Sequence, residues 1–202
     1  GTLFQMDNTR YITVENLKFG RGATGVDIRN TTEASLRWVE AFSNSVDGFL
    51  VQNSSPATME QCAAWRNGGW GLRFTAGSGS WSSGVLWSNA AGAVNLSGGS
   101  LSVRNSILQA PTTNAMVYEI GEGNFAGDHN ILWKVPGSLI GRNTFSGQSF
   151  PTLHSWQSFA AADAHSALAN PLFADSGSAD FHVRSTVGRW SPQATNWVVD
   201  AT

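Results

Sequence analysis

The chain is poor in cysteine and in lysine. Cys62 is its single cysteine among 202 residues, so a disulfide within the chain is excluded. Because Cys62 lies in the apolar stretch MEQCAAW, we expect a buried, unreactive thiol. Lys18 and Lys134 are the only lysines, and the ten arginines are scattered along the chain. No basic cluster is therefore available to bind a polyanion.

Charge of either sign is also scarce. Charged residues make up 13% of the chain, and the net charge is −2, whereas soluble domains average about 25% charged residues. We therefore expect neither nucleic acid nor an anionic membrane surface as a partner. No apolar run approaches the roughly 18 residues of a membrane span, and no secretory signal peptide is recognised. Because the opening GTLFQMDNT is typical of folded structure, we expect a segment of a longer precursor.

Glycine, serine, asparagine and tryptophan are abundant instead. The chain has 22 Gly and 9 Trp. Tryptophan offers a rigid apolar face, while amides and hydroxyls supply neutral hydrogen bonds. This combination is typical of extracellular proteins that handle neutral polymers, so we expect a secreted protein.

A repeat of about 22 to 23 residues organises the first part of the chain. A small residue followed by an alternating apolar pattern begins at Gly25 (GVDI), Gly48 (GFLV), Gly71 (GLRF) and Ala93 (AVNL). AMVY, from Ala115, continues the series after another 22 residues. The alternation predicts short strands, and a fixed period of this length indicates a solenoid.

Two residue ladders keep step with the repeat. One is aromatic or apolar and consists of Phe19, Phe42, Trp65, Trp87 and Leu108; the other consists of Asn44, Asn67 and Asn89. Like residues stacked at the strand spacing of about 4.7–4.9 Å can bury rings and exchange amide hydrogen bonds. The segments lack the leucine frame of leucine-rich repeats. They predict an all-β, right-handed parallel β-helix of about 5–6 coils over residues 1–137, with an irregular C-terminal capping segment of the same domain over residues 138–202.

The repeat LRWVEAFSNSVDGFLV resembles right-handed parallel β-helix proteins of the pectate-lyase-like group, which are largely extracellular and carbohydrate-active. HSWQSFAAADAHSALANPLFAD and DFHVRSTVGRW are similar to the segment that closes such bacterial helices. The resemblance implies the fold. It leaves the activity open, because lyases, hydrolases, epimerases and non-catalytic binders share this fold.

The residues predict no catalytic centre. A lyase of this group needs a cation site and a base, but the expected outward row of Asp27, Leu50, Arg73 and Asn95 contains a single acid. The paired carboxylates of a glycoside hydrolase and the acidic motifs of the polygalacturonases are absent. Asp47, in SVDGF, is typical of an ordinary turn.

Two histidine motifs hint at a metal site or an acid–base pair. Asp128 and His129 adjoin in GDHN, while Asp163 and His165 lie close together in DAHS. Neither motif has the spacing of a known metal triad. We expect structural hydrogen bonds here, and no metal or cofactor.

The tryptophans suggest where a ligand would bind. Trp70 replaces Asp47 and Thr24 of the preceding coils, so its ring is expected to project from a turn. Trp81 lies in GSGSWSSG, among residues too small to bury it. Trp65 and Trp87 belong to a ladder, for which core packing is the default. An exposed ring on a rigid solenoid can stack against a sugar.

We therefore hypothesise a non-catalytic carbohydrate-binding module that recognises a plant cell-wall polysaccharide such as xylan. Its expected site is Trp70, Trp81, Trp87, Asp47 and Arg73. One β-helical xylan-binding family is similar in architecture and composition. The expected partners are the polysaccharide and an appended catalytic domain, and we expect a monomer. Two alternatives remain: a polysaccharide lyase or glycoside hydrolase whose acidic residues converge from distant loops, and a purely structural segment of a surface protein.

Overall fold

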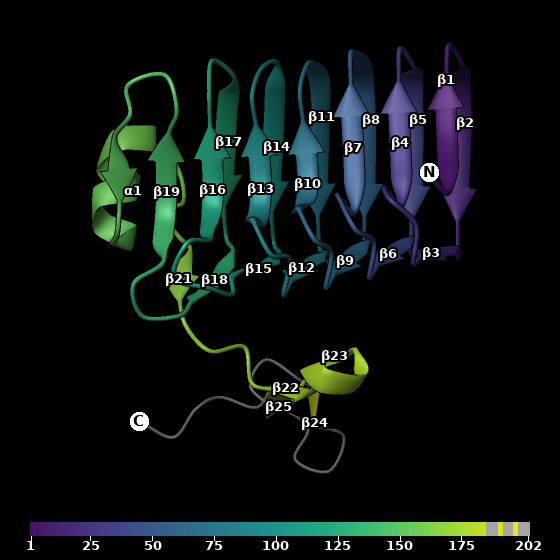
Figure 1. Cartoon of the computed structure of the whole chain (residues 1–202). Helices are drawn as coiled ribbons and strands as arrows, with labels where there is room; N and C mark the ends of the chain where they lie inside the picture. Colours follow the sequence, from purple (N-terminus) through teal and green to yellow (C-terminus); the bar gives the residue numbers. More distant parts are fainter. Residues whose placement is uncertain (185–189, 192–195, 198–202) are drawn as a thin grey trace. The chain divides into compact units, whose positions relative to one another are not determined.

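Figure 1 shows a computed structural model of the chain, which describes residues 1–184, 190–191 and 196–197. The chain divides into two compact units, Gly1–Ala169 and Asn170–Thr202. The predicted fold class is confirmed, because the first unit is an all-β solenoid of about six turns. Within the described part of the chain, no helix has the length and apolar character needed to cross a membrane.

Each turn of the solenoid contributes one strand to each of three sheets, here named A, B and C. Neighbouring turns pair in parallel and lie side by side in Figure 1. Sheet A contains β1 (Phe4–Asp7), β4 (Val26–Arg29), β7 (Phe49–Gln52), β10 (Trp70–Phe74), β13 (Gly92–Leu96), β16 (Met116–Ile120), β19 (Leu139–Asn143) and the antiparallel β20 (Ser149–Phe150). Sheet B contains β2 (Arg10–Glu15), β5 (Thr32–Arg37), β8 (Ser54–Glu60), β11 (Gly77–Ser82), β14 (Ser100–Arg104) and β17 (Asn124–Asp128). Sheet C contains β3 (Lys18–Gly20), β6 (Glu40–Phe42), β9 (Ala63–Trp65), β12 (Val85–Trp87), β15 (Ile107–Ala110), β18 (Ile131–Lys134) and β21 (Ala167–Leu168).

The strand register follows the sequence repeat closely. Phe49 pairs with Val26 and Leu72, and Leu72 pairs with Val94, as the small-residue series predicts. The continuation at AMVY is wrong in register, because Val94 pairs with Tyr118, 24 residues further on. The extra residues fall in the longer connection between β15 and β16.

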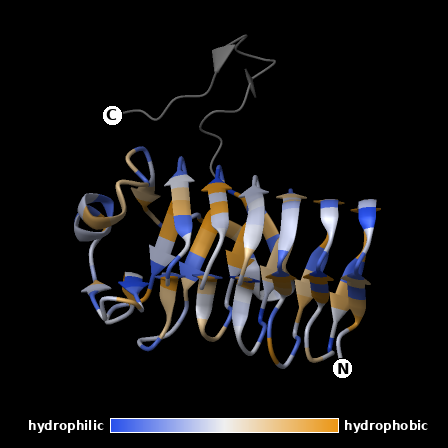
Figure 2. Cartoon of the chain, turned by 90° about the horizontal axis from the view of Figure 1, so that it is seen from above, coloured by the Kyte–Doolittle hydropathy of each residue, from blue (hydrophilic) through white to orange (hydrophobic). Residues whose placement is uncertain are grey.

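The core lies inside the coils, where one residue in two along each strand points inward. Figure 2 shows hydrophobic and hydrophilic residues alternating within the stacked strands. Inward rows run from coil to coil; their fully buried members include Ile28, Val51, Phe74 and Leu96 from sheet A, Leu36, Met59, Trp81 and Val103 from sheet B, and Ala41, Ala64, Leu86 and Leu108 from sheet C. Cys62 is buried as predicted, and burial raises the pKa of its thiol to about 12.

The aromatic ladder differs from its prediction at both ends. Trp65 pairs with Phe42 and Trp87, but Phe19 pairs with Ala41, and Leu108 pairs with Leu86 instead of Trp87. Because Leu86 belongs to the core, the adjacent Trp87 lies on the opposite, outer face of sheet C. Trp65 and Trp87 therefore lie outside the interior cluster where core packing was expected, although Trp87 is buried, at 8% exposed. The rings of Phe42 and Trp65 stack, with centroids 4.7 Å apart and planes 7° apart.

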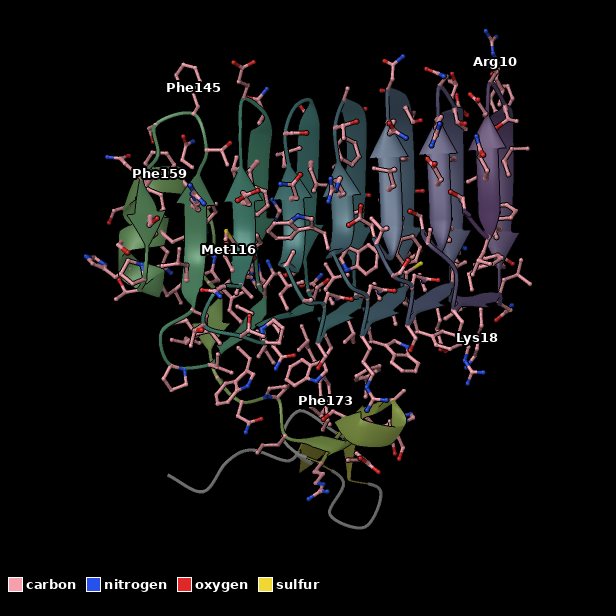
Figure 3. The ribbon with its side chains drawn as sticks, viewed as in Figure 1. Arg10, Lys18, Met116, Phe145, Phe159 and Phe173 are labelled. Atoms are coloured by element: carbon pink, nitrogen blue, oxygen red, sulfur yellow. The ribbon has the colours of Figure 1, made fainter. Side chains whose placement is uncertain are left out.

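A short helix covers the last coil of the solenoid. Helix α1 (Leu153–Ala160) begins at Thr152, which forms a capping box with Ser155. The fully buried ring of Trp156 stacks on Tyr118 at a centroid distance of 5.1 Å. Gly141 makes the room, since a Cβ there would lie 2.2 Å from the Trp156 ring. Phe145 and Phe159, labelled in Figure 3, lie at this end of the solenoid.

The second unit contains short antiparallel pairs. β22 (Phe173–Asp175) pairs with β23 (Asp180–Val183), with the 3₁₀ turn η1 (Ser176–Ser178) between them. The rings of Phe173 and Phe181 meet edge to face at 5.1 Å. β24 (Trp190–Ser191) pairs with β25 (Asn196–Trp197). The rest of the predicted capping segment, residues 185–189, 192–195 and 198–202, lies outside the described residues.

Candidate functional site

The ring of Trp70 does not project from a turn, so its predicted exposure is wrong. Trp70 is the first residue of β10 and is only 7% exposed. Its partner in the next coil is Gly92, where a Cβ would lie 2.7 Å from the Trp70 ring. The missing side chain of Gly92 leaves the space into which the ring folds. Trp70 therefore covers the neighbouring coil and offers little surface for stacking.

Trp81 is fully buried, again contrary to its predicted exposure. Its small neighbours Ser80 and Ser82 lie on the outer face of β11, because side chains alternate along a strand. The Trp81 ring points inward and meets Phe49 edge to face at 5.3 Å. Gly84 also leaves room, since a Cβ there would lie 2.6 Å from the indole nitrogen. Residues from other strands, not sequence neighbours, bury this ring.

Asp47 and Arg73 do come together, although they are 26 residues apart. Arg73 Nε lies 2.9 Å from Asp47 Oδ2, and Asp47 Oδ1 accepts a hydrogen bond from the backbone nitrogen of Trp70. Asp47 is buried, whereas the Arg73 side chain is partly exposed on the outer face of sheet A. Asp47 thus does more than form a turn, because it links two coils. Trp87, the fifth predicted residue, lies apart from this group on sheet C.

The outer face of sheet B carries a continuous row of hydroxyl groups. Five residues pair in register from β2 to β14, and we call them the hydroxyl ladder: Thr13, Ser35, Thr58, Ser80 and Ser102. All five are exposed or half-buried. Thr58 Oγ1 donates to the carbonyl oxygen of Ala34 at 3.2 Å, so its lone pairs remain able to accept a hydrogen bond.

Two shallow hollows lie over neighbouring halves of this face. The first has a volume of about 410 Å³ over β2, β5 and β8, and its lining includes Tyr11, Glu33 and Thr58. The second has a volume of about 260 Å³ over β11, β14 and β17, and its lining includes Ser78 and Asn124. β8 and β11 are adjacent strands. The hollows therefore follow the sheet along the solenoid.

Charged residues form the neighbouring row on the same face. Glu15 pairs with Arg37, Arg37 with Glu60, and Arg104 with Asp128. Arg37 Nε lies 3.2 Å from Glu60 Oε2. The signs alternate along most of the row, so this border attracts polar groups without favouring a strongly charged polymer.

Two exposed aromatic rings, Tyr11 and Trp38, lie in the first two coils. Tyr11 is 72% exposed at the first hollow, and Trp38 is the tryptophan that lies open to solvent among the described side chains, at 47%. Trp38 lines a separate hollow of about 350 Å³ with Asn16, Lys18 and Glu40. Lys18 extends outward from β3 (Figure 3) and forms a 2.8 Å ion pair with Glu40.

The two histidine motifs meet at the end of sheet B. His165 Nδ1 lies 2.9 Å from Asp128 Oδ2, and His129 Nδ1 lies 3.2 Å from the same oxygen. The His165 backbone nitrogen donates to Asp128 Oδ1 at 2.8 Å. The side-chain and backbone hydrogen bonds from His165 are the main causes that lower the pKa of the Asp128 carboxyl. Asp163 belongs to a neighbouring buried network, in which its carboxylate accepts hydrogen bonds from Trp156 Nε1 and Asn130 Nδ2.

Comparisons with protein families, curated proteins and solved structures found no match to this chain. The function is therefore argued from the site. The outer face of sheet B extends over six strands, is rich in neutral hydrogen-bonding groups, and has an exposed ring at one end. Such a surface can hold an extended polar polymer.

The sequence reasoning missed the hydroxyl ladder, Tyr11 and Trp38. A signal for the ladder is present, because its members are separated by 22, 23, 22 and 22 residues and occupy polar positions of alternating strands. For Tyr11, neither its position in the sequence repeat nor the adjacent residues indicate whether its ring is buried or exposed. Its backbone has φ of 56°, a conformation uncommon for a bulky residue, which sequence alone does not reveal.

Proposed function

We propose that the protein binds an extended, neutral polysaccharide along the outer face of sheet B. The observation that carries the proposal is the hydroxyl ladder, whose members pair in register; the first three line the first hollow and Ser102 lines the second. Hydroxyl groups both donate and accept hydrogen bonds, as sugar hydroxyls do. A polymer of repeated polar units therefore meets a surface of repeated polar units.

The spacing of the surface supports a polymer as the ligand. Paired strands lie about 4.8 Å apart, close to the advance of one sugar along an extended glycan. Each of the five strands from β2 to β14 then offers a hydroxyl group to each successive sugar. The low charge of the chain favours a neutral polymer over an acidic one, since an acidic polymer would need an unpaired basic row.

In this proposal Tyr11 and Trp38, in place of Trp70 and Trp81, stack against the sugar rings. Tyr11 borders the first hollow, and Trp38 borders the hollow beside Lys18 and Glu40. A ring that stacks centrally on a ligand typically contributes about 2 kcal/mol or more when it is truncated to alanine. Trp70 and Trp81 take a structural role in this proposal because they are buried. Arg73 remains a candidate for a contact on sheet A.

The wider context is part of the same proposal. A plant cell-wall polymer such as xylan is the first ligand to test, and the protein acts as a secreted, non-catalytic module beside a glycan-degrading catalytic domain. The composition supports this context, since glycine, tryptophan and neutral polar residues dominate and the chain carries little charge.

Affinity electrophoresis in gels that contain xylan, β-glucan or pectin tests the proposal. We expect retardation in at least one neutral gel, and loss of retardation for Tyr11→Ala and for Ser80→Arg, which blocks the ladder. Phe145→Ala is the matched control, because it removes an exposed ring at the capped end of the solenoid. No retardation in any gel, or equal retardation of all variants, would contradict the proposal. A product that absorbs in the ultraviolet would instead favour a lyase.

A further inference from the structure

Asp128, His129 and His165 form a compact cluster at the end of sheet B, beyond the last residue of the hydroxyl ladder. Asp128 is the last residue of β17, and His129 follows it in the left-handed backbone region, with φ of 58°. His165 comes from the segment between α1 and β21, 37 residues further along the chain than Asp128. All three belong to the solenoid unit. The cluster thus joins a corner of the last complete coil to the chain that follows the cap helix.

The two imidazole rings direct their Nδ1 atoms toward the same carboxylate oxygen. Both Nδ1 atoms approach Asp128 Oδ2, at 2.9 Å from His165 and 3.2 Å from His129. The rings stack with centroids 4.9 Å apart and planes 23° apart. Asp128 Oδ1 is occupied by the backbone nitrogen of His165. Oδ2 is therefore the carboxylate oxygen that faces both rings.

We propose that Asp128, His129 and His165 form a binding site for a divalent transition-metal ion of the zinc class. Tetrahedral zinc with bonds of 2.0–2.2 Å places its ligand atoms about 3.3–3.5 Å apart. The three ligand atoms of this cluster lie within 4.8 Å of one another, so small rotations of exposed side chains bring them to that geometry. Two imidazoles and one carboxylate suit zinc, copper or nickel better than calcium or magnesium.

The ion would act as a clip at the end of the solenoid. Two ligands come from the corner between β17 and β18, and the third holds the segment that leads from α1 to β21. Because an ion that binds only the folded state stabilises it by mass action, zinc should raise the thermal stability of the solenoid. The remaining coordination position would be filled by water, since both histidine rings are exposed.

A similar pair elsewhere in the chain provides a matched control. His182 Nδ1 lies 2.6 Å from Asp180 Oδ1 in β23, and both side chains are exposed. Among the residues that the structure describes, no second histidine joins this pair in a metal-ligating group. The Asp180–His182 pair therefore has the same histidine–aspartate contact as the cluster but lacks a third metal ligand.

Isothermal titration calorimetry with Zn²⁺ tests the proposal on the whole chain. We expect one ion per chain and an increased melting temperature for the wild type and for His182→Ala. His129→Ala, His165→Ala and Asp128→Asn should each lower the affinity by more than the 10–100-fold that is typical of losing a second-shell partner. Circular dichroism without metal checks that each variant folds; since the histidine side chains are exposed, we expect all to do so.

Three results would overturn the proposal. They are the absence of saturable Zn²⁺ binding by the wild type, an unchanged affinity in His165→Ala, and a loss of binding in His182→Ala. None of these outcomes depends on polysaccharide binding, so failure of the metal site and failure of the proposed function are distinguishable.

Discussion

The side-chain amide of Asn67 donates a hydrogen bond to Oδ1 of Asn89, one coil further along, at 2.8 Å. Asn44 repeats the arrangement with Asn67 at 3.0 Å, and the backbone nitrogens of Asn44 and Asn67 donate to the same oxygens. All three residues are buried. The amide ladder expected from the sequence is therefore present, and it holds the corner between sheets C and A with groups that both donate and accept.

Removing the middle amide should destabilise the solenoid. Asn67→Ala leaves the buried backbone nitrogen of Asn44 without its acceptor and removes the side-chain amide bonds to Asn89 and to the carbonyl oxygen of Ala41. Each buried group that loses its partner costs about 1–3 kcal/mol. We expect the free energy of unfolding, measured with urea, to fall by about 3 kcal/mol. Asn124→Ala is the control, because Asn124 donates to Ser100 between exposed side chains; we expect the free energy of unfolding to fall by less than about 1 kcal/mol. Equal losses in both variants would contradict the account.

Asp163 should anchor the cap. Its fully buried carboxylate accepts hydrogen bonds from Trp156 Nε1 at 3.0 Å and from Asn130 Nδ2 at 3.1 Å, as well as from the Ser166 hydroxyl. Asp163→Ala leaves the indole nitrogen of Trp156 and the hydroxyl of Ser166 without this acceptor, so we expect the free energy of unfolding to fall by about 3 kcal/mol.

Urea denaturation followed by tryptophan fluorescence measures the effect of Asp163→Ala. Asp175→Ala is the control, because Asp175 also accepts several hydrogen bonds but lies exposed in the second unit. A solenoid as stable in Asp163→Ala as in the wild type would show that the cap does not depend on this carboxylate.

Stability should decrease in alkali because of Tyr118. Burial, followed by the nearby Asp163 carboxylate, raises the pKa of its phenol well above the usual value. The unfolded chain loses this proton near pH 10, whereas the folded chain retains it. Above about pH 10 the unfolded state therefore binds fewer protons, and the stability present below that pH is progressively lost.

The phenolate absorbance of Tyr11→Phe isolates this effect, since the chain has two tyrosines. We expect no phenolate absorbance from the folded variant as the pH passes 10, and its appearance together with unfolding. Reversible ionisation near pH 10 in the folded variant would show that Tyr118 is not buried as described.

The sequence was sufficient to predict the coils, because their register depends on a period that small residues mark. It was insufficient to predict ring direction. Trp70 occupies a column of polar turn residues, and only the position of Gly92 on the next coil reveals where its ring folds. Trp81 is surrounded by small residues in sequence, yet its partners in space come from other sheets.

The site was partly predictable. The spacing of the hydroxyl ladder is visible in the sequence, although its signal is weak because serine and threonine also occur in turns. The meeting of Asp128 with His165 was not predictable, because it depends on the path of the irregular segment around α1. The sequence contained both motifs but no period that related them.

The dependence of affinity on ligand length tests the central claim most directly. Six strands at a spacing of about 4.8 Å extend over about 24 Å, room for roughly five sugars. Calorimetry with linear oligosaccharides of the polymer that binds should show affinity that increases with each sugar up to about five and then levels off, and Ser80→Arg should abolish the increase. Equal affinity for a disaccharide and a hexasaccharide, or an increase that persists in Ser80→Arg, would contradict binding along the outer face of sheet B.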